Sequence, residues 1–167
     1  DVAVLTDTKD NANGGTFTSG AWRTRDLNTA LRLTDLGGSL SNNEFTLAPG
    51  TYVIEFDCPT IYVNYSSTRL YNVTAGEEVG AGATNSLCQQ GYIRNVNYVG
   101  MNRIYQKTSK IILTAATTFR VEHQCSVAEE SQNYLPISPT RLDGWFGDFH
   151  PNSQLWRCRC IKVQKRI

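Results

Sequence analysis

The sequence has no long apolar run and almost no net charge. A membrane-spanning helix needs about 18 or more consecutive apolar residues, and none occurs in the 167 residues. The net charge is +1, so no whole-molecule field draws the chain to nucleic acid or to an anionic membrane. The polar start, DVAVLTDTKDN, also lacks the residue order of a signal peptide. We expect no nucleic-acid partner and no membrane insertion.

The sequence also lacks the common metal and catalytic motifs. Its five cysteines include no CxxC pair, so neither a zinc ribbon nor a complete disulfide framework is visible, and reduced thiols in strands are expected. The motifs GxSxG, GxxxxGK[ST], GxGxxG and HExxH are absent. Only His123 and His150 are available as histidine bases. These absences predict a protein that is not an enzyme and has no cofactor.

The composition predicts one globular domain rich in strands and turns. Hydrophobic residues make up 40% of the chain and charged residues 19%, and there are 13 glycines. Residues 1–15 end in the turn cluster NANGG and are expected to be a leading strand or a linker, with the domain over 16–167. Residues 15–31 are expected to open the domain as its first strand, with Trp22 in the core.

Apolar residues alternate with a period of two along most of the later chain. Residues 44–47 and 51–58 predict a hairpin-like pair about Pro49 and Gly50. Further strands are predicted over 61–65, 68–73, 110–114 and 118–125, a turn over 74–77, and loops over 89–98 and 126–151. Residues 26–36 can be drawn as a helix, but their asparagine and threonines favour a loop between strands.

In the closing strand, residues 156–163, the apolar residues change from even-numbered to odd-numbered positions after Cys160. Either a bulge lies near Cys160, or both faces of the strand are covered, for example by a neighbouring subunit. Eight or more short strands without a convincing helix predict an all-β protein that folds as a single jelly-roll β-sandwich.

Several blocks of sequence, in order over most of the chain, resemble one family. They are TFTSGAWRTRDLNT (16–29), NNEFTLAPGTYVIEF (42–56), RLYNVTAG (69–76), SKIILTAATTFRVEHQC (109–125) and RCIKVQKRI (159–167). They are similar to the small complement-type or tumour-necrosis-factor-like jelly-roll domains of bacteriophage tail-fibre and related virion proteins. The resemblance implies a homotrimeric structural or adhesive protein. The chain departs from the pattern over 134–155, where binding specificity would reside.

The best candidate binding site is the loop DGWFGDFH, residues 143–150. Aromatic rings can stack on sugar rings while carboxylates accept hydrogen bonds from hydroxyls. The candidate residues are Asp143, Trp145, Phe146, Asp148 and His150, with Tyr92 and Arg94 from the second loop. The alternatives are a metal site, packing of the aromatics beneath the loop or against another subunit, and, for 89–98, a solvated crossover.

Two other groups are expected to be structural. Arg23, Arg25 and Asp26 predict a buried ion-pair group beside Trp22, with a guanidinium stacked on the indole. His123 is expected inside the core, where Cys125, two residues on, is an inert thiol. The triplets at Asn64 and Asn72 fit the glycosylation pattern but arise often by chance.

The resemblance and the loops together favour a non-enzymatic virion domain. We expect a phage tail-fibre tip on the surface of the particle, bound to other virion proteins and to a host-surface glycan or protein. The first alternative is a capsid decoration or head-fibre knob with a purely structural role. The second is a glycan-active hydrolase, for which no recognisable pair of carboxylates is present.

Overall fold

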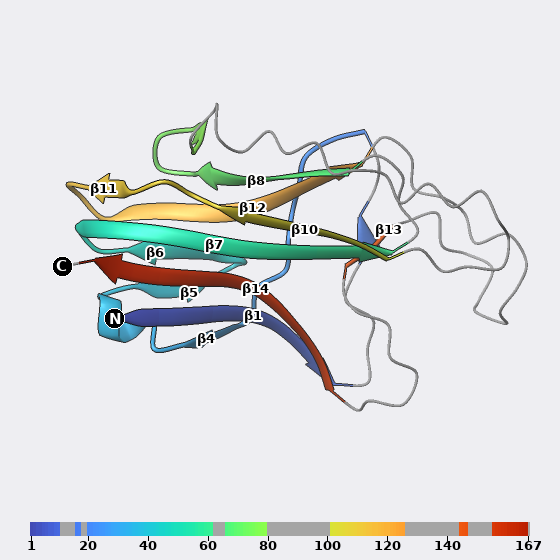
Figure 1. Ribbon diagram of the computed structural model, residues 1–167, viewed down its shortest axis with the longest axis horizontal. Helices are drawn as coiled ribbons and strands as arrows, with labels where there is room; N and C mark the ends of the chain where they lie inside the picture. Colours follow the sequence, from blue (N-terminus) through green and yellow to red (C-terminus); the bar gives the residue numbers. More distant parts are fainter. Residues whose placement is uncertain are drawn as a thin grey trace, which may run out of the picture.

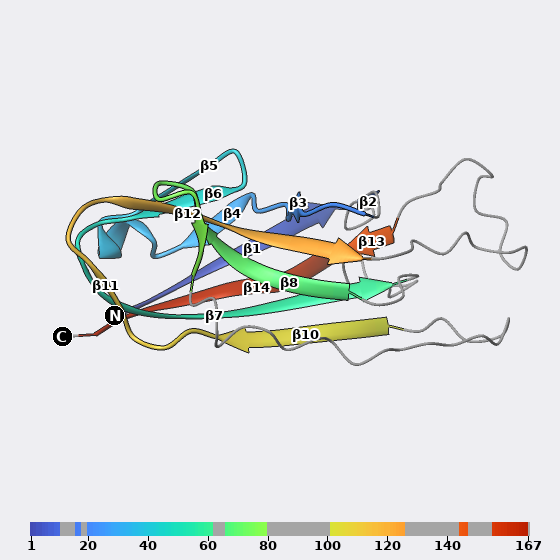
Figure 2. The same ribbon diagram turned by 90° about the horizontal axis from the view of Figure 1, so that it is seen from above.

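The computed structural model describes residues 1–10, 16–17, 20–61, 66–79, 101–125, 144–146 and 155–166. Side chains are described within 1–8, 20–58, 67–79, 104–124 and 161–166. Two antiparallel sheets pack face to face as a sandwich, whose layers are seen edge-on in Figure 2. The expected all-β sandwich is therefore confirmed.

The larger sheet has eight strands in the described part of the chain. Its hydrogen-bonded order is β2, β13, β7, β14, β1 and β4, and β10 and β11 pair with the other edge of β7. It lies toward the viewer in Figure 1. The strands are β1 (Val2–Asp10), β2 (Thr16–Phe17), β4 (Thr29–Leu31), β7 (Gly50–Ile61), β10 (Met101–Lys107), β11 (Ile111–Leu113), β13 (Gly144–Phe146) and β14 (Leu155–Arg166).

The smaller sheet has six strands in the same ranges. Their order is β5, β6, β12, β8 and β9, and β3 also pairs with β12. They are β3 (Arg23–Thr24), β5 (Ser39–Ser41), β6 (Glu44–Leu47), β8 (Ser66–Asn72), β9 (Glu77–Glu78) and β12 (Thr117–Cys125). The one helical element within the described residues is a single 3-10 turn, η1 (Thr34–Leu36). The loop-like prediction for 26–36 thus missed a short strand, β4, but was right to reject a longer helix.

The chain crosses repeatedly between the two sheets. From β6 in the smaller sheet it passes to β7 in the larger, to β8 and β9 in the smaller, to β10 and β11 in the larger, and to β12 in the smaller before ending in β14. Successive crossing between two antiparallel sheets is the connectivity of a jelly roll.

The expected hairpin of residues 44–47 and 51–58 is wrong. β6 pairs with β12, and β7 pairs with β14, so the chain turns a corner from one sheet to the other at Pro49. Phe45 and Ile54, both 0% exposed, face the same core from opposite sheets. Alternating apolar and polar residues in two successive strands indicate that both strands face the same core. Two strands joined at a corner between sheets have this pattern just as two strands of a hairpin do.

The expected single strand over 15–31 is also wrong. The structure divides these residues into β2, β3 and β4, which belong to two sheets. The Arg25 amide donates to Val121 O of the smaller sheet at 2.9 Å, and the Asn28 amide donates to Thr6 O of the larger sheet at 3.1 Å. A segment that crosses the open side of a sandwich cannot remain one straight strand. The first long strand is instead β1, between β14 and β4.

The core lies between the sheets and is built from the inward positions of the long strands. Even-numbered residues of β7 face inward, and β12 does the same with odd-numbered residues. The Phe45 and Phe119 rings lie across from each other, with centroids 5.7 Å apart. The buried apolar set is Ala3, Leu5, Leu27, Leu33, Leu36, Phe45, Leu47, Tyr52, Ile54, Phe56, Cys58, Leu70, Ile104, Phe119, Val121, Ile161 and Val163.

A bulge in β14 confirms the first explanation of the parity change. Leu5 of β1 is opposite Ile161, but Thr6 is opposite Arg159, so Cys160 is the extra residue. Beyond the bulge, β14 stays paired with β1 and leaves β7. β13 takes its place beside the last residues of β7, Thr60 and Ile61. This split of the larger sheet is visible where β1 and β14 bend away from β7 in Figure 1.

Candidate functional site

The structure places the centre of the predicted binding loop in a short strand. Gly144–Phe146 form β13, and Trp145 pairs with Thr16 of β2 on one side and with Ile61 of β7 on the other. The other candidate residues lie outside the described residues and stay predictions; they are Asp143, Asp148, His150, Tyr92 and Arg94.

β13 lies at the opposite end of the sandwich from the chain ends. The Lys165 amide donates to Asp1 O at 2.9 Å beside the start of β7, where Arg166 pairs with Thr51. β13 pairs with the last residue of the same strand, Ile61. A 12-residue strand that rises ~3.3 Å per residue places these two ends about 36 Å apart. In Figure 1, β13 lies toward the right of the sandwich and the two chain ends lie at the left.

The outer face of the larger sheet carries exposed apolar side chains. Among the described residues, the large hydrophobic side chains that are exposed are Leu31, Tyr105 and Ile112, at 63%, 59% and 67%. Each pairs in register with a residue at an outward position of the neighbouring strand, so all three project from this one face. Leu31 is on β4 at one side of the sheet, and Ile112 is on β11 at the other.

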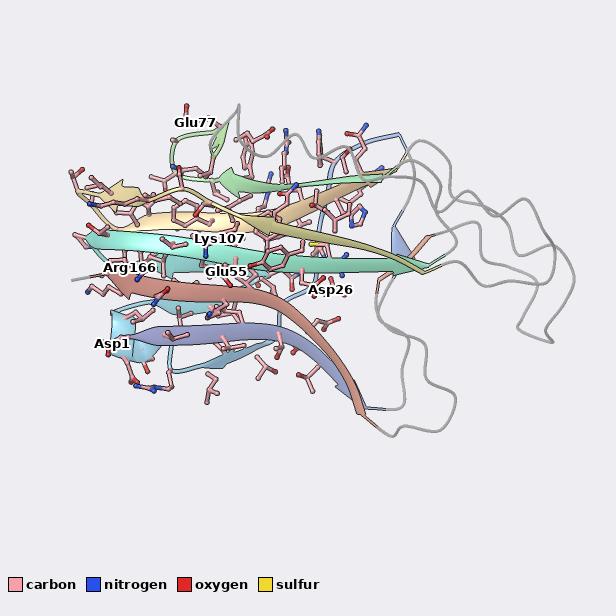
Figure 3. The ribbon with its side chains drawn as sticks, viewed as in Figure 1. Asp1, Asp26, Glu55, Glu77, Lys107 and Arg166 are labelled. Atoms are coloured by element: carbon pink, nitrogen blue, oxygen red, sulfur yellow. The ribbon has the colours of Figure 1, made fainter. Side chains whose placement is uncertain are left out.

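Charges at the centre of this face are already paired. The Glu55 carboxylate is 3.0 Å from Lys107 Nζ and 3.6 Å from Lys162 Nζ, and Lys107 lies beside it in Figure 3. The hydrogen bond from Lys107 is the main cause that lowers the pKa of the Glu55 carboxyl, and a hydrogen bond with Tyr105 lowers it further. Because Lys107 and Lys162 of the same chain pair with Glu55, covering this face would not leave the Glu55 carboxylate as an unpaired buried charge.

Sequence reasoning missed this face. The run Ile111-Ile112-Leu113 holds the signal that could have found it: three consecutive apolar residues in a strand must place one side chain away from the core. Ile111 and Leu113 pack against the core, and Ile112 projects from the sheet.

The outer face of the smaller sheet is polar and self-paired. The Arg69 guanidinium lies 4.2 Å from the Trp22 ring centroid and 4.9 Å from that of Tyr71, and Arg120 lies 4.9 Å from the Tyr71 centroid. Glu122 accepts from both arginines. The charged groups of this face are thus paired with one another, and the contact with Arg69 holds Trp22 against the sheet.

The predicted group around Trp22 is therefore only partly correct. Trp22 is half-buried, outside the core, and the arginine stacked on it is Arg69. Arg23 is exposed, although its register partner on β12 is the buried His123. Arg25 is buried, at 1% exposed, and bonds to His123. The contact of Arg69 with Trp22 and the contact of Arg25 with His123 thus each join residues that are distant in the sequence.

His123 is a core residue, as predicted, and is 0% exposed. Burial is the larger cause that lowers its pKa well below the ordinary value, and the charge of Arg25 lowers it further. The Cys125 side chain lies outside the described part. The predicted inertness of that thiol therefore stays a prediction.

Local turn chemistry accounts for the triplet at Asn72. Asn72 Oδ1 accepts from the Ala75 amide at 3.0 Å, and Thr74 Oγ1 accepts from the Thr118 amide at 2.9 Å. Both polar side chains of the triplet thus fix the turn after β8. The triplet at Asn64 lies partly outside the described residues.

Neither a metal-binding group nor a membrane-spanning helix is found in the described residues. Within them, no group of three or more His, Cys, Asp or Glu side chains could hold a metal ion. Within the same ranges, no helix is long and apolar enough to cross a membrane.

The comparisons with known proteins leave the family open. No family model matches the chain, and no curated protein matches it.

Proposed function

We propose that this chain is the jelly-roll domain of a trimeric virion protein, a phage tail-fibre tip that binds a host-surface glycan or protein. The observation that carries the proposal is the contrast between the two outer faces. The smaller sheet presents side chains that pair with one another, whereas the larger sheet exposes Leu31, Tyr105 and Ile112. Covering these side chains by a neighbouring copy would remove their apolar surface from water.

The positions of these side chains favour a ring over a two-fold dimer. A two-fold interface uses one patch on both subunits, whereas a head-to-tail interface joins two different patches and closes into a ring. Leu31 and Ile112 lie at opposite sides of the same face. We therefore propose that the Leu31 side of one copy contacts the Ile112 side of the next. Because the resemblance implies a trimer, the proposed ring has three copies.

We expect Leu31→Lys and Ile112→Glu each to dissociate the trimer, because each buries an unpaired charge in the interface. The loss should be at least about 30-fold in affinity, which corresponds to about 2 kcal/mol. Light scattering coupled to size-exclusion chromatography measures the change.

The double variant, with both substitutions in one chain, should restore assembly, because the introduced lysine of one copy then pairs with the introduced glutamate of the next. Ala75→Lys, in an exposed turn of the smaller sheet, is the matched control and should leave the trimer intact. A monomeric unmodified protein would exclude the trimer. A trimer that tolerates both single changes would place its interface elsewhere.

The receptor-binding end is proposed to be the end that bears β13, away from the chain ends. Trp145→Ala is expected to weaken binding of the purified trimer to intact bacterial cells at least about tenfold, because it removes an aromatic stacking surface. Binding to a panel of strains, measured by flow cytometry, tests this.

Trp145→Phe keeps an aromatic ring and should retain most of the binding. If Trp145→Ala instead unfolds or dissociates the trimer, the tryptophan packs within the protein. Release of reducing sugar from cell envelopes would favour the glycan-hydrolase alternative.

A further inference from the structure

Residues 23–28 close one side of the sandwich. They run from the smaller sheet, where β3 pairs with Glu122 and His123 of β12, to the larger sheet, where the Asn28 amide donates to Thr6 O. Between these points, the Leu27 amide donates to Asn43 Oδ1 at 3.0 Å. We call residues 23–28 the closing segment. On the smaller sheet its backbone is held by the two residue pairs of the β3 ladder and by the Arg25 amide, which donates to Val121 O at 2.9 Å.

A buried side-chain contact also fastens the closing segment to the smaller sheet. Arg25 Nη1 lies 3.1 Å from His123 Nδ1, and the two residues are 1% and 0% exposed. A guanidinium has only donors. Nδ1 must therefore be the acceptor, which makes His123 a neutral imidazole with its proton on Nε2.

Proton uptake by His123 is incompatible with this contact. A proton on Nδ1 would turn the acceptor into a donor and place two cations 3.1 Å apart in the interior. We propose that the Arg25–His123 pair is an acid-sensitive latch, and that protonation of His123 releases the closing segment from the smaller sheet.

The ionisable groups around His123 come from the closing segment and from both sheets. Its register partner on β3, Arg23, is exposed and positive. The side chain of Glu122 projects from the opposite face, where it binds two arginines of the smaller sheet. Asp26 of the closing segment is half-buried, and Asp7 and Cys58 of the larger sheet are buried. Burial and the Arg25 charge are the causes that act on the pKa of His123.

The direction of the pH effect follows from this lowered pKa. The closed state holds His123 neutral, whereas the released segment leaves it with an ordinary pKa near 6.5. The latch is therefore fully formed above about pH 6.5 and weakens as the pH falls toward the lowered value. For one proton, the open population rises by up to about tenfold per pH unit in this window.

Hydrogen exchange measured by mass spectrometry tests the latch. In the full chain, exchange of residues 20–28, corrected for the intrinsic pH dependence, should accelerate by about tenfold or more between about pH 7.5 and about pH 5. His123→Asn retains an acceptor near the position of Nδ1 but cannot titrate, so its exchange should stay constant. His150→Asn, which changes the other histidine, should behave like the unmodified protein.

Three results would overturn the proposal. They are constant protection of residues 20–28 in the unmodified protein, the same acid response in His123→Asn, and unfolding of the whole sandwich by circular dichroism over the same pH range. If His123→Asn does not fold, nitrogen-15 NMR of the unmodified protein decides instead. The latch requires an Nε2–H tautomer that titrates below about pH 6.5, and an Nδ1–H tautomer or a higher midpoint excludes it.

Discussion

Glu122→Ala should cost the domain about 3–5 kcal/mol of unfolding free energy, the range found when one partner of a buried ion pair is removed. Glu122 is 3% exposed although it lies on the outer face of the smaller sheet. Its two carboxylate oxygens accept from Arg69 Nε at 2.5 Å and from Arg120 Nε at 2.7 Å. Without the carboxylate, the partly buried Arg69 and Arg120 on adjacent strands would keep only the longer contacts with Glu78, at 3.8 Å, and with Glu44, at 3.3 Å.

Urea denaturation followed by circular dichroism measures this loss. The matched control is Glu44→Ala: Glu44 also binds Arg120, at 3.3 Å, but its side chain is 30% exposed. A partly solvated pair of this kind contributes about 0–1 kcal/mol. Equal losses in the two variants would show that burial of Glu122 does not set its contribution. A loss below about 1 kcal/mol for Glu122→Ala would contradict its role between the two arginines.

A loss of similar size is expected in the core from Phe119→Ala. Phe119 is 1% exposed, lies within β12 and packs on Phe45. Removing a buried phenyl ring loses its transfer free energy and leaves a cavity, which together cost about 3–5 kcal/mol. Domains have a total stability of about 5–15 kcal/mol, so this variant would be marginally folded.

Thermal and urea unfolding check the Phe119 prediction. Phe119→Leu fills most of the same volume and should lose only about 1–2 kcal/mol. An alanine variant as stable as the leucine variant would mean that the sheets close over the cavity. Both changes lie inside the sandwich. We therefore expect them to change the oligomeric state only as far as they unfold the domain.

The sequence predicted the strands whose inward positions are mostly apolar. Phe119, Val121 and His123 alternate with polar residues in β12, and the parity change at Cys160 indicated the bulge in β14. β10 was missed because its inward residues include Gln106, which is 5% exposed. Gln106 donates to Thr68 O rather than packing as an apolar group. A polar residue at an inward position hides the period of two on which the prediction depends.

The candidate sites were harder to predict because their contacts join distant parts of the chain. Arg25 and His123 are 98 positions apart, and the arginine that stacks on Trp22 comes from β8 rather than from the neighbouring sequence. Local composition identified the right kinds of interaction and assigned some to the wrong partners. The pairing of β3 and β8 with the same strand, β12, brings these residues together.

The bulge at Cys160 also bears on how such a protein can change. It separates β14 from the end of β7, and in the described part of the chain β13 and β2 join the larger sheet through Thr60 and Ile61. The pairings of β14 with β1 and with β7 do not involve β2 or β13, so we expect substitutions in this short ribbon to leave the register of the long strands unchanged. A change of sequence at this end is therefore expected to alter the surface that the end presents while the long strands keep their pairing.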